Sequence, residues 1–320
     1  LVQGSGALPG GPLFGLGVWL NVQLRLRQTD GLPALDSWRV GRLPLPTALA
    51  QPLLQAAAQH LGVVPDLALV AEVLQQVQFG QDALTLVYVW RGDTAYRVLS
   101  AMTPPAEQLR LRAYSDLMVD LTAGRGPEWR VDLASLIGPL FELAQRRSLS
   151  EDAALENRAA ILTLALYTTG RGVGAVVPAA RAWPRPLRVQ VVLHERDDFP
   201  QHFMVSAMLA IEGTSPLTRA IGLHKEMVDA RSGSGFSFND LAANRAGQRF
   251  GEMALAEPAR LQAALARGVS DASLMPDVAD LPEFLSEAEF ARRYGRVGSA
   301  GYNRVLADIE ARLNALGLYR

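Results

Sequence analysis

One stretch of the chain, from His194 to Gly251, holds most of the side chains that could do chemistry. Three of the four histidines lie in it, together with Lys225, the only lysine, and a high density of carboxylates. Carboxyl and imidazole groups are common general acids and bases in enzymes, and they are also metal ligands. We therefore expect the functional site of this protein within this stretch.

Spacing sorts the polar side chains of this stretch onto three expected helices. Residues three or four apart share one face of a helix. Gly247 and Gly251 extend one of these stripes, and such small residues would let another helix approach closely. We expect the three faces to converge on one polar pocket. The pairs are, in chain order, Asp198 and His202, Glu226 and Asp229, and Asp240 and Asn244.

The first interpretation of this pattern is acid–base catalysis on a glycan. Glu226 would be a general acid at a helix end, and the glycine-rich segment after it carries a second polar group, as in lysozyme-like enzymes. This hypothesis assigns catalysis to Glu226, Asp229, Ser237 and Asp240. It assigns substrate binding to Asp198, His202, His224, Phe236 and Asn244.

Two other interpretations of the same residues stay open. In one, the carboxylates and Asn244 form a buried hydrogen-bonded lock between helices, because buried polar groups must find partners. In the other, Ser234 or Ser237 is a nucleophile, although Gly233-Ser234-Gly235 lacks the G-x-S-x-G spacing and follows an expected helix. Ser237 and Asn239 are also candidate N-caps for the helix that follows them.

A metal site is a further alternative, built from His194, His202 and His224. Nitrogen and oxygen ligands suit zinc, but no H-E-x-x-H motif is present. The glycine pattern over residues 170–174 follows an expected helix and not a strand, which argues against a dinucleotide site. Our site assignment therefore contains no metal and no cofactor.

The order of these motifs is similar to that of the YfiM/VanZ-like bacterial cell-envelope proteins. Those proteins share a D…HF, then KE or E, then S..D..N..G pattern. The resemblance covers about residues 198–251 and implies a cell-envelope setting. VanZ-like proteins are embedded in membranes, whereas the apolar runs of this stretch are too short to span one. The matching positions are Asp198, His202, Phe203, Lys225, Glu226, Asp229, Ser237, Asp240, Asn244 and Gly247.

Composition narrows the class of protein. The chain has 320 residues, of which 49% are hydrophobic and 20% charged, as in globular proteins with a real core. A net charge of -1 argues against a nucleic-acid partner. The absence of cysteine excludes disulfides, thiolate metal sites and a cysteine nucleophile. No apolar run reaches the ~18–20 residues that a membrane helix needs.

The expected fold class is α+β, a small N-terminal sheet-plus-helix module followed by a mainly α-helical domain. Residues 1–12, rich in Gly and Pro, are expected to be a flexible leader, residues 13–102 the α+β module, and residues 103–320 the helical domain that carries the site. Alternating and apolar runs predict strands over 18–27, 38–43, 70–78, 83–90 and 187–193. Helical periodicity and end signals predict helices over 47–61, 93–102, 105–123, 131–147, 151–169, 200–212, 216–230, 239–256, 258–266 and 301–316.

Two motifs outside the main stretch are given structural roles. Glu156-Asn157-Arg158 precedes an apolar run on an expected helix, so we interpret it as a tie between helices. Trp183-Pro184-Arg185-Pro186 could stack on a sugar or peptide, but its prolines favour a rigid linker.

These features predict a periplasmic bacterial envelope protein, a lysozyme-like hydrolase or lytic enzyme acting on peptidoglycan or another envelope glycan. The alternative is a non-catalytic periplasmic scaffold or binding protein. Because the chain begins at Leu1, we also expect a removed upstream signal, or an anchor that tethered the protein to the inner membrane.

Overall fold

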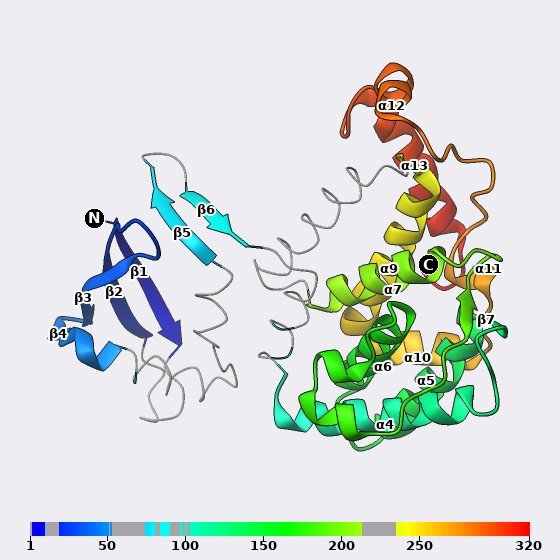
Figure 1. The fold of residues 1–320 in the computed structure, drawn as a ribbon, viewed down its shortest axis with the longest axis horizontal. Coiled ribbons are helices and arrows are strands. Elements are labelled where there is room, and N and C mark those ends of the chain that lie inside the picture. The colour runs from blue at the N-terminus through cyan, green and yellow to red at the C-terminus, as the bar shows by residue number, and fades with distance from the viewer. Residues whose placement is uncertain are drawn as a thin grey trace. The chain divides into compact units, whose positions relative to one another are not determined.

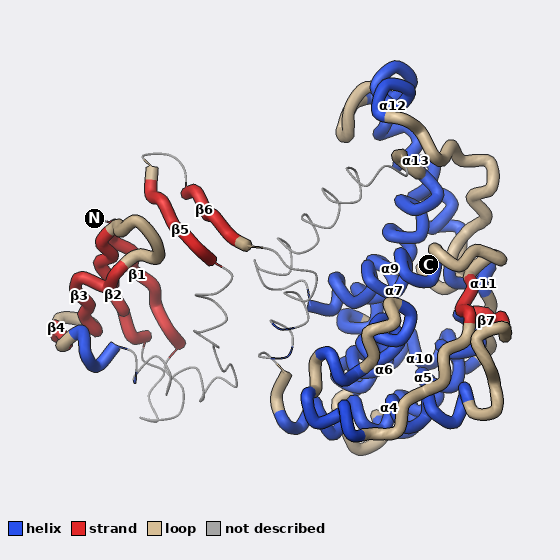
Figure 2. The backbone as a smooth tube through the Cα atoms, viewed as in Figure 1, coloured by secondary structure: helices blue, strands red, loops and turns tan. Residues whose placement is uncertain are grey.

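The computed structural model describes residues 2–9, 19–50, 52, 74–80, 84–89, 97, 100, 103–212 and 235–320. The chain divides into two compact units, Leu1–Pro104 and Pro105–Arg320. The protein is α+β, with antiparallel strands in the first unit and a mainly helical second unit (Figures 1 and 2). Within the described residues, no helix combines the length and apolar character needed to cross a membrane.

The first unit contains a four-stranded antiparallel sheet in the order β1-β2-β3-β4 and a separate hairpin, β5-β6. Gly41, with φ at 59°, makes the turn between β3 and β4, and the Trp38 indole is buried there with Nε1 donating to the Pro46 carbonyl (3.0 Å). The strands are β1 Val2–Pro9, β2 Trp19–Arg27, β3 Ala34–Val40, β4 Leu43–Leu45, β5 Leu74–Phe79 and β6 Leu84–Tyr88.

The expected flexible leader is wrong over most of its length, because β1 pairs with β2 along the whole of Val2–Pro9. An edge strand hydrogen-bonds on one side only, so it tolerates the Gly and Pro content that suggested a leader. The expected strand over 38–43 is divided by the turn at Gly41. Most of the expected helix over 47–61, and all but two residues of that over 93–102, lie outside the described residues.

The second unit is a helical assembly with one small parallel strand pair, β7-β8. The expected helices at 105–123, 151–169, 200–212, 239–256, 258–266 and 301–316 are confirmed, with ends within two residues. The helices are α4 Pro105–Thr122, α5 Leu133–Arg147, α6 Ala153–Thr168, α7 Phe199–Glu212, α9 Phe238–Ala256, α10 Pro258–Ala266, α11 Asp271–Leu274, α12 Glu287–Tyr294 and α13 Ala300–Ala315.

Two details of the second unit differ from expectation. The helix expected over 131–147 begins at Leu133, because Arg130–Asp132 forms β7 and pairs with β8, Gln190–Val192. The short helices α11 and α12 were not predicted, since one or two turns are too short to display a helical period. Two 3-10 turns, η3 (Val173–Ala175) and η4 (Pro178–Ala182), connect α6 toward β8.

Helix α6 is the centre of the second unit. It contacts α4, α5, α7, α9 and α10, which surround it in Figure 1. Its residues from Ala159 to Leu166 are buried on every face, as expected for a helix without a solvent side. The side chain of Asp152 caps its start by accepting hydrogen bonds from the backbone of Ala154 and Leu155.

The first turn of α6 ties the surrounding helices together, which confirms the structural role expected for Glu156-Asn157-Arg158. The fully buried Glu156 carboxylate accepts hydrogen bonds from Tyr114 Oη (2.6 Å), Arg110 Nε (2.8 Å) and Arg147 Nε (2.7 Å). Burial alone would raise the pKa of Glu156, but these hydrogen bonds outweigh it and hold the pKa below its usual value. The carboxylate therefore stays ionised and joins α4 and α5 to α6.

The next two residues extend this tie to other helices. Asn157 Nδ2 donates to the Ala254 carbonyl at the end of α9 (3.0 Å), and Asn157 Oδ1 accepts from Gln262 of α10 (2.8 Å). Arg158 pairs with Glu107 of α4 (2.8 Å) and Glu212 of α7 (2.6 Å). One helical turn thus contacts all five neighbours of α6.

The pair α7 and α9 packs closely along the stripe that contains Gly247 and Gly251. The sequence predicted close packing along this stripe and placed its polar end against the helix of Glu226, which lies outside the described residues. A Cβ added to Gly247 would lie 2.7 Å from the carbonyl carbon of Phe203. One added to Gly251 would lie 2.8 Å from Ala210 Cβ. Such distances are far inside van der Waals contact, so only glycine permits this separation of the two backbones.

We predict that Gly247→Ala lowers the free energy of unfolding by about 1–3 kcal/mol, because the obstacle is backbone that cannot rotate away. This loss should appear despite the gain of up to ~1 kcal/mol that alanine normally brings to a helix. Denaturant unfolding followed by circular dichroism measures it. Gly317→Ala is the matched control, since its Cβ would meet nothing within 4 Å. Equal stabilities of the two variants would contradict the close-packing account.

We also predict that Glu156→Gln destabilises the second unit by about 3–5 kcal/mol, because it removes the fully buried charge with which Arg110 and Arg147 both pair. The exposed Glu142, 3.9 Å from Arg146, provides the control, and Glu142→Gln should change stability by less than ~0.5 kcal/mol. Since the pKa of Glu156 is lowered in the folded state, its contribution is present above the ordinary carboxyl pKa and is lost as the pH falls through the lowered value. Stability of the variant equal to wild type at pH 7 would refute this role.

Candidate functional site

The structure brings several predicted site residues to one end of the α7–α9 pair. Asp198 and His202 lie at the start of α7, and Asp240 and Asn244 lie in the first two turns of α9. Because the two helices pack closely, these side chains meet across the contact. Glu226, Asp229 and His224 lie outside the described residues, so their predicted roles stay predictions.

We call Asp198, His202, Ser206, Asp240 and Asn244 the α7–α9 cluster. The Nε2 atom of His202 lies 3.5 Å from Asp240 Oδ2, and its Nδ1 atom lies 3.3 Å from Asn244 Oδ1. Ser206 Oγ donates to the same Asn244 oxygen (2.9 Å). Asn244 Oδ1 is an acceptor, so the proton of a neutral imidazole belongs on Nδ1, which leaves Nε2 as an acceptor toward Asp240.

Arg196 holds Asp198 in its ionised form. Its guanidinium donates to both carboxylate oxygens of Asp198 (3.0 and 2.6 Å), pairs with Glu283 (2.9 Å) and lies over the Phe199 ring (4.6 Å). Burial tends to raise the pKa of Asp198, but the hydrogen bonds from Arg196 lower it overall. Arg196 follows a tight turn in which His194 and Glu195 adopt left-handed φ values of 49° and 62°.

The pKa of Asp240 is shifted in the opposite direction, above its usual value. Burial raises its pKa, the negative charge of Asp198 raises it further, and His202 opposes both effects. Its Oδ1 atom is buried and has no hydrogen-bond partner among the described residues. Asp240 therefore takes up a proton at a higher pH than Asp198 beside it.

Ser237 and Phe236 have structural contacts at the start of α9. Ser237 is the N-cap, as predicted, and its Oγ accepts from the backbone N–H of Asp240 (3.1 Å), which fixes the position of that carboxyl group. The Phe236 ring packs against Phe238 (4.9 Å) and Phe290 of α12 (4.4 Å). These ring contacts join the start of α9 to α12. The sequence suggested substrate binding for Phe236, and this packing between helices was not predicted.

The zinc alternative gains no geometric support from the described residues, which contain no group of three or more potential ligands that could hold a metal. His194 and His202 have separate surroundings. His194 Nε2 lies 2.8 Å from the Met275 carbonyl, and its backbone N–H donates to Asp271. His202 faces Asp240 and Asn244 instead.

The arrangement of Asp198 and Asp240 suits proton transfer. Two neighbouring carboxyl groups whose environments move their pKa values apart can act as an acid and a base at the same pH. The side chains of Asp198 and Asp240 are 38% and 32% exposed, so both are partly accessible to solvent. The cluster can therefore donate a proton from one residue and stabilise positive charge with the other.

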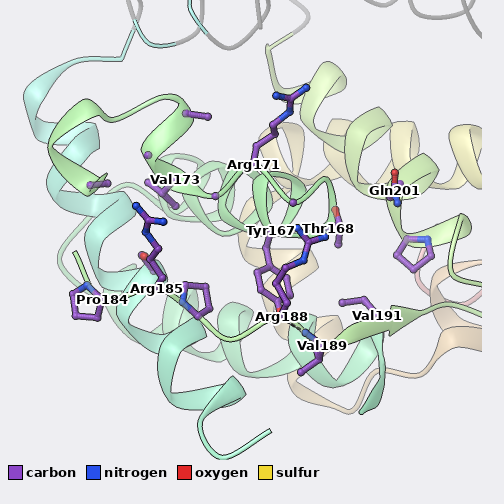
Figure 3. A pocket seen from close by; sticks show the side chains of 18 of the residues that line it. Tyr167, Thr168, Arg171, Val173, Pro184, Arg185, Arg188, Val189, Val191 and Gln201 are labelled. Atoms are coloured by element: carbon purple, nitrogen blue, oxygen red, sulfur yellow. Dashed lines mark hydrogen bonds between the residues drawn. The ribbon is translucent and has the colours of Figure 1, made fainter. Parts of the chain in front are cut away.

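A second feature was missed by the sequence analysis. A cavity of about 750 Å³, shown in Figure 3, is lined by the glycine loop after α6 and by the segment that was interpreted as a linker. The charge pattern of the sequence could have indicated it. No Asp or Glu occurs between Glu156 and Glu195, whereas arginines recur in that stretch. Among them, Arg171, Arg181, Arg185 and Arg188 line the cavity.

We predict opposite stability effects for the two carboxylates. Asp240→Asn should raise the melting temperature at pH 7, because it removes a buried charge whose ionisation opposes folding. The difference should vanish as the pH falls and wild-type Asp240 becomes protonated. Asp198→Asn should lower the melting temperature at pH 7, and this loss should also vanish below the lowered pKa of Asp198.

Calorimetry between pH 3 and pH 7 measures both effects, and Asp116→Asn, in an exposed pair with Arg112, is the control. Shifts of the same sign for Asp240→Asn and Asp198→Asn would contradict the electrostatic assignment.

Comparison of this chain with protein-family models, with curated proteins and with solved structures finds no match.

Proposed function

We propose that the second unit is a glycan-cleaving enzyme of the bacterial cell envelope, with Asp240 as proton donor and Asp198 as the partner carboxylate. The observation that supports this proposal is the opposite direction of the two pKa shifts within one cluster. Glycosidases use a carboxylic acid kept protonated by its surroundings and a second, ionised carboxylate beside the scissile bond.

The chemistry assigned to each residue follows from its contacts. Asp240 protonates the glycosidic oxygen as the bond to the sugar ring breaks, and Asp198 stabilises the positive charge that develops on the ring. Arg196 keeps Asp198 ionised, and Ser237 holds the Asp240 backbone in place. His202 interacts electrostatically with both carboxyl groups and acts to lower the pKa of each.

The cell-envelope setting and the peptidoglycan substrate rest on the motif resemblance over residues 198–251, and a periplasmic location follows from the same argument. Glu226 is the predicted further carboxylate of this site, and in the sequence analysis it was the expected general acid. The proton is assigned to Asp240 because burial raises the pKa of that carboxyl group. Glu226 and Asp229 are then candidates for water activation.

A second candidate is the non-catalytic scaffold or binding protein, which one observation favours. Asn244 accepts hydrogen bonds from Ser206 and lies against His202, so part of the cluster is a polar tie between α7 and α9. In that case the carboxyl groups contribute to helix packing and to ligand binding, and no bond is cleaved.

The test is release of soluble fragments and new reducing ends from purified peptidoglycan, with each variant shown to be folded by circular dichroism. Asp240→Asn and Asp198→Asn should each lower kcat by about 10²–10⁴-fold, the usual loss when a general acid or base is removed. Glu226→Gln tests the remaining carboxylate. Asp116→Asn, on the exposed face of α4, should retain full activity.

Two results separate the candidates. Cleavage by wild type that survives Asp240→Asn would refute the assignment of the proton donor. Peptidoglycan binding without fragment release in wild type, across pH 4 to pH 8, would favour the binding protein.

A further inference from the structure

The arginine-lined cavity has the size and position of a ligand site. It lies between the end of α6, the loop through η3 and η4, β8 and the first turn of α7. Figure 3 shows Arg171 on the loop after α6, Arg185 and Arg188 on the segment before β8, and Gln201 of α7 at the other side of the cavity. A volume of about 750 Å³ lies within the range of small-molecule pockets, which is roughly 300–1,000 Å³.

The charge of the lining is strongly positive. Among the described residues of the lining, Arg181, Arg185 and Arg188 share the cavity with one carboxylate, Asp197. Within the described residues, no ion pair joins Arg181, Arg185 or Arg188 to a carboxylate, whereas Arg196 and Arg110 of the same unit are paired with two or more each. Three arginines beside one carboxylate repel each other, and an anion in the cavity would relieve that repulsion.

The backbone that carries Arg188 is held rigidly. Tyr167 Oη donates to the Leu187 carbonyl (2.6 Å) and accepts from the Val189 N–H (3.1 Å), so it fixes the chain on both sides of the arginine. Thr122 Oγ1 accepts from the Leu187 N–H (3.0 Å). The guanidinium lies against Gly170, where an added Cβ would be 2.8 Å from Nη2, so the missing side chain leaves room for it.

The other arginines are also positioned by their own segments. Arg185 lies between two prolines, which restrict its backbone, and its Nη2 donates to the Arg181 carbonyl (3.4 Å). Trp183 anchors the same segment under the Arg112 guanidinium, 4.8 Å from the ring centre. The cationic groups are thus presented on restrained backbone, which lowers the entropy lost on binding.

We propose that this cavity binds a small phosphorylated molecule, with the arginines on the phosphate or pyrophosphate oxygens. The planar guanidinium donates two parallel N–H groups to two oxygens of one phosphate. Several arginines against one aspartate leave an excess of positive charge that a single carboxylate would not neutralise, whereas a phosphate carries nearly two negative charges and a pyrophosphate more. The Pro, Val and Ala side chains of the lining contact the organic part of the ligand.

This inference is independent of the proposed glycan cleavage. Asp197, Pro200 and Gln201 line the cavity, whereas Asp198 and His202 belong to the α7–α9 cluster. The first turn of α7 therefore lies between the two sites. Binding at the arginine cavity is measured without any catalytic readout.

The test is isothermal titration calorimetry of the full chain with pyrophosphate as the probe, with citrate as a polycarboxylate of similar charge. Pyrophosphate should bind at one site, more tightly than citrate, with an affinity that weakens as salt is added. Arg188→Ala, and separately the double variant Arg181→Ala/Arg185→Ala, should each weaken pyrophosphate binding by about tenfold or more, as expected for losing charge-assisted hydrogen bonds. Arg267→Ala, an exposed arginine just after α10, should leave the affinity unchanged.

Three results would overturn the proposal. The first is no pyrophosphate binding to wild type at millimolar concentration. The second is an equal loss of affinity in Arg267→Ala, which indicates general attraction to positive charge. The third is tighter binding of citrate than of pyrophosphate, which assigns the cavity to carboxylates. Arg188→Lys keeps the charge without the planar fork, so it distinguishes lost geometry from a folding defect.

Discussion

The close contact between α7 and α9 determines where the polar residues of the second unit meet. Gly247 and Gly251 allow the backbones of the two helices to approach until no Cβ would fit between them. At that separation, short side chains such as Ser206 and Asn244 reach across the contact, and His202 lies between Asn244 and Asp240. A wider spacing would admit water and remove the desolvation that raises the Asp240 pKa.

The first turn of α6 holds the neighbours of this pair in place. Arg158 reaches Glu212 at the far end of α7, and Asn157 reaches the last turn of α9, so both helices are tied at the ends opposite the cluster. Buried charges are costly unless they are fully paired, and Glu156 is paired with three donors. A network of this kind favours one arrangement of helices over others that would break it.

The start of α7 joins two surfaces of different electrostatic character. On one side, Arg196 and Asp198 lead into the α7–α9 cluster, where two carboxyl groups have pKa values shifted in opposite directions. On the other side, Asp197 and Gln201 border the arginine-lined cavity. Both surfaces depend on the same short segment between β8 and α7, so a change in its conformation would alter the two together.

Much of the helical unit could be predicted from local sequence. Helices such as α9 and α10 follow from apolar periodicity, from the N-cap Ser237 and from Pro258 in the first turn, because these signals act within a few residues. The close packing of the Gly247 stripe was predictable for a related reason, since two glycines inside a helix are unfavourable unless a neighbour needs the space. The sequence also grouped His202, Asp240 and Asn244, but it could not name α7 as the helix that Gly247 faces.

Contacts between distant residues were decided only by the tertiary structure. β1 has no strong signal of its own and exists as a strand because β2 supplies its hydrogen-bond partners. Arg196 and Glu283 are far apart in the chain, and the cavity likewise draws its lining from α4, from the loop after α6 and from the start of α7. No local period encodes such pairings, since which segments become neighbours depends on how all the helices pack at once. The residue types were therefore readable in advance, whereas their partners, their burial and hence their pKa values were not.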